Sequence, residues 1–261
     1  MKEFFGIGGY TREPEGYLSP EHLLFVTSLM AVMTALASWL GLRNRNRSPA
    51  GRRVLMIAAI LIDSIELFKI VFLCIRGGDP LNWLYDLPLF LCSIHLITIP
   101  LAAWTGGRMR EAALDFVFIF GLLSAVMGTY GAGQNYSAYP VLSFDNVVSG
   151  LTHAISGFCS LYIVIAGMAS MKRRNIWITF CILGGFCVAA YAVNHIIDYN
   201  YMFLMAGDGT PYDIVYNWVN GHKVLYPLLV VALFLVYILV FYLVFYLIEK
   251  RQNPPSPAGN T

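Results

Sequence analysis

A cysteine and two histidines are the residues of this chain whose types and spacing suit nucleophilic chemistry. Cys92 and His95 lie three residues apart in one apolar segment, and His153 lies in another. A thiol becomes a useful nucleophile when a nearby base or cation promotes its ionisation, and histidine is the usual partner. The pattern therefore offers Cys92 a base in His153 or in His95. The alternative is that Cys92 is a small apolar residue of a helix.

Charged residues inside apolar segments form a second group of candidates. Glu66 and Lys69 are three residues apart, as are His195 and Asp198. An ionisable residue within a membrane span costs about 2.5–3.5 kcal/mol, so such residues usually face the interior of a bundle and often mark function. A Glu66–Lys69 ion pair would lower this cost and would be purely structural. The alternative interpretation is that these charged residues form a binding site.

Depth in the membrane determines whether these groups can meet. Cys92 and His153 each lie about six residues, or roughly 9 Å, from the same end of their segments. Lys69 and His195 lie at about the same level. Four segments thus deliver polar groups to one layer, and we expect a polar cavity that opens toward the outside or the outer leaflet.

The composition is that of a membrane protein. Of the 261 residues 58% are hydrophobic and 12% are charged, whereas a soluble domain carries about 25% charged residues. Membrane lipids are therefore the expected surroundings, and the net charge of +2 gives no indication of a nucleic-acid partner. The five cysteines show no disulfide or metal-ligand spacing, so neither a metal nor a cofactor is predicted.

Seven segments are long and apolar enough to span a membrane as helices. The sequence predicts an all-α fold, a polytopic seven-transmembrane-helix bundle in residues 19–251. Residues 1–18 are expected to form a short extracytoplasmic N-terminal segment, and residues 252–261 a disordered cytoplasmic tail. The predicted spans are 20–42, 54–75, 87–105, 113–132, 147–170, 176–197 and 224–248.

Basic residues predict the orientation. Twelve of the seventeen Lys and Arg residues lie in four clusters that adjoin the same end of these spans. Positive charge in short loops stays on the cytoplasmic side. We therefore expect the N-terminus outside, the C-terminus in the cytoplasm, and a multi-pass protein of the plasma membrane. The clusters are residues 43–53, 108–110, 172–174 and 250–251.

Five motifs resemble those of the YwaF-like bacterial integral membrane proteins, whose animal relatives are the transmembrane-164 lipid acyltransferases. Phe90 stands where that family usually has histidine, and little remains of its terminal WPWY sequence. His95 is one turn away from Cys92 and could replace the missing imidazole. The motifs are Ser19-Pro20-Glu21-His22-Leu23, Leu87-Pro88-Leu89-Phe90-Leu91-Cys92, the stretch ending in His153, Asn194 with Asn200-Tyr201-Met202-Phe203-Leu204, and Tyr226.

The resemblance implies seven helices and a catalytic pair of Cys92 and His153 that transfers or hydrolyses an acyl chain of a phospholipid. Asn194 or Asn200 would donate to the oxyanion. Two other functions stay open. One is a transporter or small-molecule-binding protein, and the other is a structural subunit of a membrane complex whose partner proteins the sequence does not identify. The charged site of a transporter would consist of Glu66, Lys69, His195 and Asp198.

Overall fold

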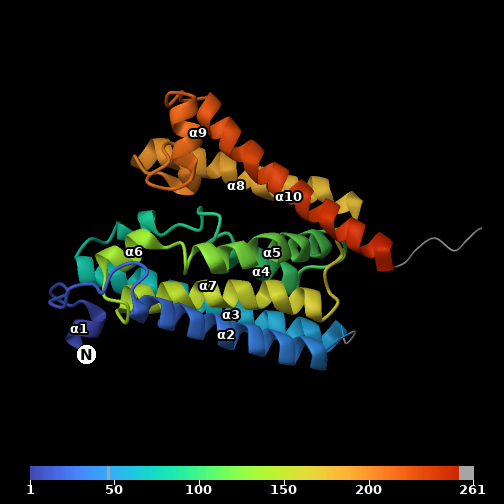
Figure 1. Cartoon of the computed structure of the whole chain (residues 1–261), viewed down its shortest axis with the longest axis horizontal. Coiled ribbons are helices and arrows are strands. Elements are labelled where there is room, and N and C mark those ends of the chain that lie inside the picture. The colour runs from blue at the N-terminus through green and yellow to red at the C-terminus, as the bar shows by residue number, and fades with distance from the viewer. Residues whose placement is uncertain (46–47, 253–261) are drawn as a thin grey trace, which may run out of the picture.

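The structure, a computed structural model, describes residues 1–45 and 48–252, and the regular secondary structure in this part is all helical (Figure 1). The α-helices are α1 (Lys2–Phe5), α2 (Pro20–Arg43), α3 (Ser48–Gly77), α4 (His95–Trp104), α5 (Gly107–Met127), α6 (Gly133–Ala138), α7 (Phe144–Ile165), α8 (Ile176–Ile197), α9 (Tyr212–Trp218) and α10 (Leu225–Gln252). Three short 3-10 helices are η1 (Asn82–Tyr85), η2 (Arg173–Asn175) and η3 (Tyr201–Phe203).

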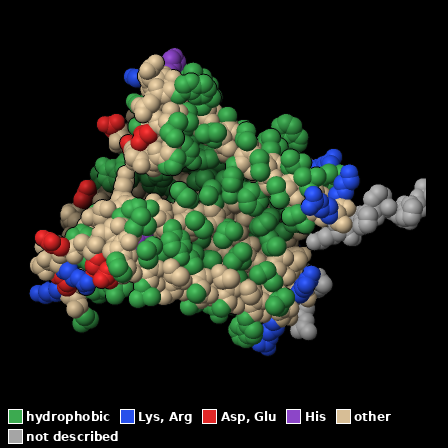
Figure 2. All heavy atoms as spheres, viewed as in Figure 1, with side chains coloured by type: hydrophobic (Ala, Val, Ile, Leu, Met, Phe, Trp, Pro, Cys, Tyr) green, Lys and Arg blue, Asp and Glu red, His purple; other side chains and the backbone are tan. Residues whose placement is uncertain are grey.

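Four helical stretches among the described residues are long and apolar enough to cross a membrane. They are α2, α7, α10 and the stretch Arg173–Ile197 that contains α8. The other predicted spans also overlap helices, but α4 has only ten residues and α3 carries three charged side chains in its middle. Apolar side chains cover much of the face shown in Figure 2. The chain is therefore an all-helical membrane protein, and the number of spans remains a prediction.

The helices form two layers. Helices α2, α3, α4, α5 and α7 make one bundle around a core that includes Leu55, Ile99 and Tyr162. Helices α8 and α10 make the second layer and pack on α5 around Phe120 and Val230 (Figure 1). Helix α5 belongs to both cores and lies between the layers.

Small residues let α5 and α7 approach closely. A Cβ atom at Gly121 of α5 would lie 2.6 Å from the Ser156 carbonyl oxygen of α7, and one at Gly157 of α7 would lie 2.6 Å from the Ala125 Cβ. Neither position has room for a larger residue. Close backbone approach at small residues is a common way for membrane helices to pack, because lipid supplies no hydrophobic drive for their association.

Helix α4 is shorter than the predicted span 87–105. It begins at His95, and Leu87–Ile94 forms turns instead. Pro88 has no backbone N–H and restricts the residue before it to extended conformations, so a helix is disfavoured at this point. Cys92 therefore lies on a turn before the helix and does not share a helical face with His95.

The N-terminal segment packs against the bundle. The Tyr10 hydroxyl donates to the Asp145 carboxylate at the start of α7, and Arg76 at the end of α3 lies 2.7 Å from the same carboxylate. Burial, together with this hydrogen bond, raises the pKa of Tyr10 to about 12. The segment thus joins the ends of α3 and α7. Helix α10 ends at Gln252, and the rest of the predicted tail lies outside the described residues.

Asp115 of α5 connects the two layers. It is fully buried, and its carboxylate accepts hydrogen bonds from the backbone N–H groups of Ser170 and Met171 at 3.0 and 2.9 Å. It also accepts from Asn175 Nδ2 at 3.2 Å and from the Tyr242 hydroxyl of α10 at 3.0 Å. These donors are neutral, so the buried carboxyl group is satisfied by hydrogen bonds rather than by an ion pair.

Replacing Asp115 by asparagine should lower the free energy of unfolding by about 2–4 kcal/mol, because the new NH₂ group would face donors. Thermal unfolding in detergent would measure this. Glu111→Gln, one turn earlier and partly exposed, is the matched control and should cost less than about 1 kcal/mol. Equal losses in the two variants would show that Asp115 has no special role.

Glu111 makes an ion-pair cluster whose strength depends on pH. Hydrogen bonds from Lys172 and Arg174 lower its pKa from 4.5 to about 2. The cluster should therefore contribute its full stability above pH 4.5 and lose it as the pH falls toward 2. Because the carboxylate is partly exposed, solvent screening keeps this contribution small. We expect acidification from about pH 6 to about pH 3 to lower the unfolding temperature less in Glu111→Gln than in the natural protein.

Candidate functional site

A buried ion network joins α3 to the loop before α4. Lys69 Nζ lies 2.5 Å from Glu66 Oε1 and 3.0 Å from Asp86 Oδ1. The three side chains expose only 11–20% of their surface. We call Glu66, Lys69 and Asp86 the Lys69 cluster. It holds one ammonium between two carboxylates and fastens the start of the turn segment to α3.

Cys92 lies on the turn that follows Asp86. Ser93 stabilises this turn, since its hydroxyl accepts from the Phe90 N–H at 3.0 Å and donates to the Phe90 carbonyl at 3.1 Å. The cysteine is half-buried and lies within electrostatic reach of Glu66 and Lys69. The Lys69 cluster and the candidate nucleophile are therefore neighbours.

His153 reaches the same region from α7. Its Nδ1 lies 3.1 Å from the Ser124 Oγ of α5, and its ring lies directly against Gly128. A Cβ atom at Gly128 would stand 2.1–2.3 Å from the ring atoms, so this glycine makes room for the imidazole. The ring lies within electrostatic reach of Lys69 and His95. Its Nε2 forms no hydrogen bond with the described residues.

His95 differs from His153 in access. It is fully buried, with its Nδ1 3.3 Å from Thr98 Oγ1, and its Nε2 is sealed without a hydrogen-bond partner among the described residues. The structure therefore brings Cys92, Lys69 and both histidines into one region. Within residues 1–45 and 48–252 no hydrogen bond joins the Cys92 thiol to either imidazole.

His195 and Asp198 do not join the Lys69 cluster. Both are exposed at the end of α8, where the His195 ring lies 4.5 Å from that of Tyr191 and Asp198 caps the helix in a left-handed conformation. In the described part of the chain, Lys69 instead pairs with Glu66 and with Asp86.

Asn194 and Asn200 shape the loop after α8. Asn194 Oδ1 accepts from the Tyr201 N–H at 2.7 Å, and its Nδ2 donates to the Tyr201 carbonyl at 3.0 Å. Asn200 bonds in the same way to the backbone of Met205 and Ala206 at 2.8 Å each. Both amides are thus engaged in holding the loop, and an oxyanion would have to displace these bonds.

Tyr201 connects this loop to the turn segment that carries Cys92. Its hydroxyl donates to the Leu84 carbonyl at 2.5 Å and accepts from the Leu87 N–H at 3.1 Å. The Phe90 ring packs 4.9 Å from the Tyr201 ring. From the other side, the Tyr226 hydroxyl donates to the Phe203 carbonyl at 2.7 Å. Hydrogen bonds therefore connect the turn segment, the loop after α8 and the start of α10, which are far apart in the sequence.

Comparison with known proteins identifies the family. A family model described as the TMEM164 family matches residues 17–245, which is most of the chain. The chain belongs to the TMEM164 family. Neither the curated proteins nor the solved structures gave a match. The predicted relation to the animal transmembrane-164 proteins is confirmed, and the YwaF-like relation stays a prediction.

The region shared with the TMEM164 family contains the Lys69 cluster, Cys92, His153 and the loop around Tyr201. In this TMEM164-family chain, Phe90 occupies the position at which we expected a histidine. Its ring contacts the rings of Tyr199 and Phe203 at centroid distances of 6.1 and 6.0 Å. The side chain at this position therefore belongs to an aromatic cluster, and the imidazoles of the region come from α4 and α7.

Sequence reasoning missed three residues of the site. Asp86 could have been found by asking which acid adjoins a predicted span at the level of Lys69, since a buried ammonium needs partners. Ser124 and Gly128 carry no such signal, because their contacts with His153 depend on how α5 and α7 pack.

Gly128→Ala should displace the His153 ring and lower the free energy of unfolding by about 1–3 kcal/mol, the usual cost of overpacking. Thermal unfolding in detergent would measure this. The double variant Gly128→Ala with His153→Ala should regain part of the loss, because the smaller side chain makes room.

Gly184→Ala in α8 is the control for this experiment, because its new methyl group would have no atom within 4 Å. Alanine also favours a helix over glycine by about 1 kcal/mol, so this variant should be neutral or slightly stabilised. A Gly128→Ala variant as stable as Gly184→Ala would contradict the close contact.

Proposed function

We propose that this TMEM164-family protein is an intramembrane enzyme that transfers or hydrolyses an acyl chain of a phospholipid, with Cys92 as nucleophile and His153 as base. The observation that carries the proposal is that Cys92 lies on the turn that Asp86 fastens to Lys69, while Ser124 of α5 holds the His153 ring of α7 at 3.1 Å. In this proposal a thiol from the turn before α4 and an imidazole from α7 react together near the Lys69 cluster. Catalytic hydrogen bonds are often long without substrate and tighten when it binds.

The reaction would proceed through a thioester. His153 Nε2 takes the thiol proton while the Cys92 sulfur attacks the ester carbonyl, and the imidazolium then protonates the departing lipid alkoxide. A hydroxyl group of a second lipid, or water, next gives its proton to His153 and attacks the thioester. This step releases the acylated product and restores the thiol.

The Lys69 cluster supports a base-assisted mechanism. Its two carboxylates outweigh its single ammonium, so it offers the thiol no net positive charge, and the proton needs an acceptor. To stabilise an oxyanion, Asn194 or Asn200 would have to release the backbone carbonyl that its amide now binds.

We also propose the topology predicted from the sequence, which is seven spans in the plasma membrane with the N-terminus outside. The segment 1–18, the membrane domain 19–251 and the cytoplasmic tail remain part of this proposal. In support, the basic clusters gather at one end of the molecule, while acidic groups are seen at the other (Figure 2). The Cys92 site lies toward the acidic end, which the positive-inside rule places outside.

Transport receives less support than acyl transfer. A charged site of Glu66, Lys69, His195 and Asp198 would need its four members together, and the last two are exposed on α8. A purely structural role for the Lys69 cluster would explain its ion pairs, but it would leave no role for the Nε2 of His153, which has no hydrogen-bond partner among the described residues.

Incubation with a phospholipid that carries a labelled acyl chain should leave a hydroxylamine-sensitive acyl group on Cys92. Cys92→Ala should abolish this labelling, and His153→Ala should slow it by at least about a hundredfold, as expected for loss of a general base. Mass spectrometry of the labelled peptide would locate the acyl group.

Cys74→Ala is the matched control, because Cys74 is also half-buried but lies outside the site. It should leave labelling unchanged. Labelling that is equal at Cys74 and Cys92, or that survives in Cys92→Ala, would exclude the proposed nucleophile. Loss of proton- or ion-driven uptake in Glu66→Gln, with Cys92→Ala fully active, would favour transport instead.

A further inference from the structure

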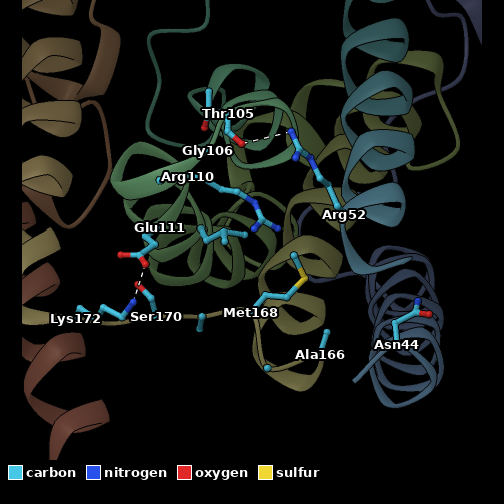
Figure 3. A pocket seen from close by; sticks show the side chains of 14 residues that line it. Asn44, Arg52, Thr105, Gly106, Arg110, Glu111, Ala166, Met168, Ser170 and Lys172 are labelled. Atoms are coloured by element: carbon cyan, nitrogen blue, oxygen red, sulfur yellow. Dashed lines mark hydrogen bonds and ion pairs between the residues drawn. The ribbon is translucent and has the colours of Figure 1, made fainter. Parts of the chain in front are cut away.

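A cavity lies at the basic end of the bundle, away from Cys92. Its volume is about 590 Å³, within the usual range of small-ligand sites. Arg52 in its wall lies 17 residues before Lys69 on α3, which is about 25 Å along the helix. Its walls come from the ends of α2, α3, α4 and α5 and from the loop after α7 (Figure 3). The lining includes Asn44, Arg52, Thr105, Arg110 and Met168.

Two arginines on different helices reach into this cavity. Arg52 of α3 donates from Nε to the Ala103 carbonyl at 2.7 Å and from Nη2 to the Trp104 carbonyl at 2.9 Å. Arg110 of α5 donates from Nε to the Ala102 carbonyl at 3.2 Å. Each guanidinium thus caps the end of α4 with one edge. Arg52 Nη1 and both Nη atoms of Arg110 form no hydrogen bond with any described residue and stay available.

The two guanidiniums have no carboxylate partner among the described residues. The acid of the cavity wall, Glu111, pairs with Lys172 at 2.6 Å and with Arg174 at 3.1 Å. Burial and the neighbouring charge of Arg52 both lower the pKa of Arg110. Two guanidiniums that line one cavity repel each other, and an anion between them would relieve this repulsion.

The cavity has space for such an anion. A Cβ atom at Gly106 or Gly107 would meet nothing within 4 Å, so the chain leaves this side open at the start of α5. Met168, Leu114 and Ala166 line other parts of the wall with apolar surface. An anion here would therefore meet arginine forks on one side and apolar groups on another.

We propose that this cavity binds a phosphate group between the guanidiniums of Arg52 and Arg110, either free or as part of a phospholipid headgroup. A phosphate has enough oxygens to accept from the free edges of both guanidiniums at once, and arginine forks match its geometry. The site is separate from the proposed acyl-transfer centre.

Arginine modification would test this on the unaltered full-length protein in detergent. Phenylglyoxal would label exposed guanidiniums, and peptide mass spectrometry would give the rate at each position. Dioctanoyl phosphatidic acid or inorganic pyrophosphate near saturation should slow labelling of Arg52 and Arg110 about tenfold. Arg53 and Arg108, exposed outside the cavity, should be unaffected. Protection by the lipid alone would identify a headgroup site, and protection by both probes a site for the phosphate group itself.

Protection of none of the four arginines, or equal protection of all four, would overturn the proposal. The variant Arg110→Gln gives a second test, since it should weaken binding of the protecting probe about tenfold, as loss of a charge-assisted contact does. Arg53→Gln is its control and should bind normally. If Arg110→Gln fails to fold, the protection pattern of the natural protein still decides the question.

Discussion

The buried ammonium of Lys69 is the constraint on which the candidate site depends. An ion removed from water is costly unless partners surround it, and removing one partner of a buried pair costs about 3–5 kcal/mol. Glu66 supplies one partner from the same helix, and Asp86 supplies the other from the loop. Because Lys69 needs this second carboxylate, the ion pair with Asp86 holds the loop against α3. The same contact positions the following turn, on which Cys92 lies.

The backbone groups of this turn need hydrogen-bond partners, and aromatic residues and asparagines around it supply or position them. Backbone that is not helical leaves N–H and carbonyl groups to be satisfied at membrane depth, where water is scarce. The Tyr201 hydroxyl satisfies two such groups, at Leu84 and Leu87, and Asn194 holds Tyr201 in place. The second layer of helices is therefore a support for the turn, and a change in the loop after α8 would be felt at Cys92.

The two candidate sites lie toward opposite ends of the bundle. The thiol of Cys92, the imidazole of His153 and the Lys69 cluster lie toward one end. The guanidiniums of Arg52 and Arg110, without a carboxylate partner in the described part of the chain, lie at the other. Asp115 connects the layers near the basic end through neutral donors alone. Helix α5 contributes to each of these places, with Ser124 beside His153, Asp115 between the layers and Arg110 in the cavity. Any movement of this helix would affect all three.

The amino-acid sequence by itself determined the helical class, the positions of the long helices and the gathering of basic residues at one end, because these follow from local hydropathy and charge along the chain. It also pointed to Cys92, His153 and Lys69, through their similar depth. Only the tertiary structure decided that Asp86 pairs with Lys69 while His195 and Asp198 lie apart from it, that α4 begins after Cys92, and that the amides of Asn194 and Asn200 hold a loop. The partner of a buried polar group is decided by how helices pack, and packing depends on contacts between residues far apart in the chain.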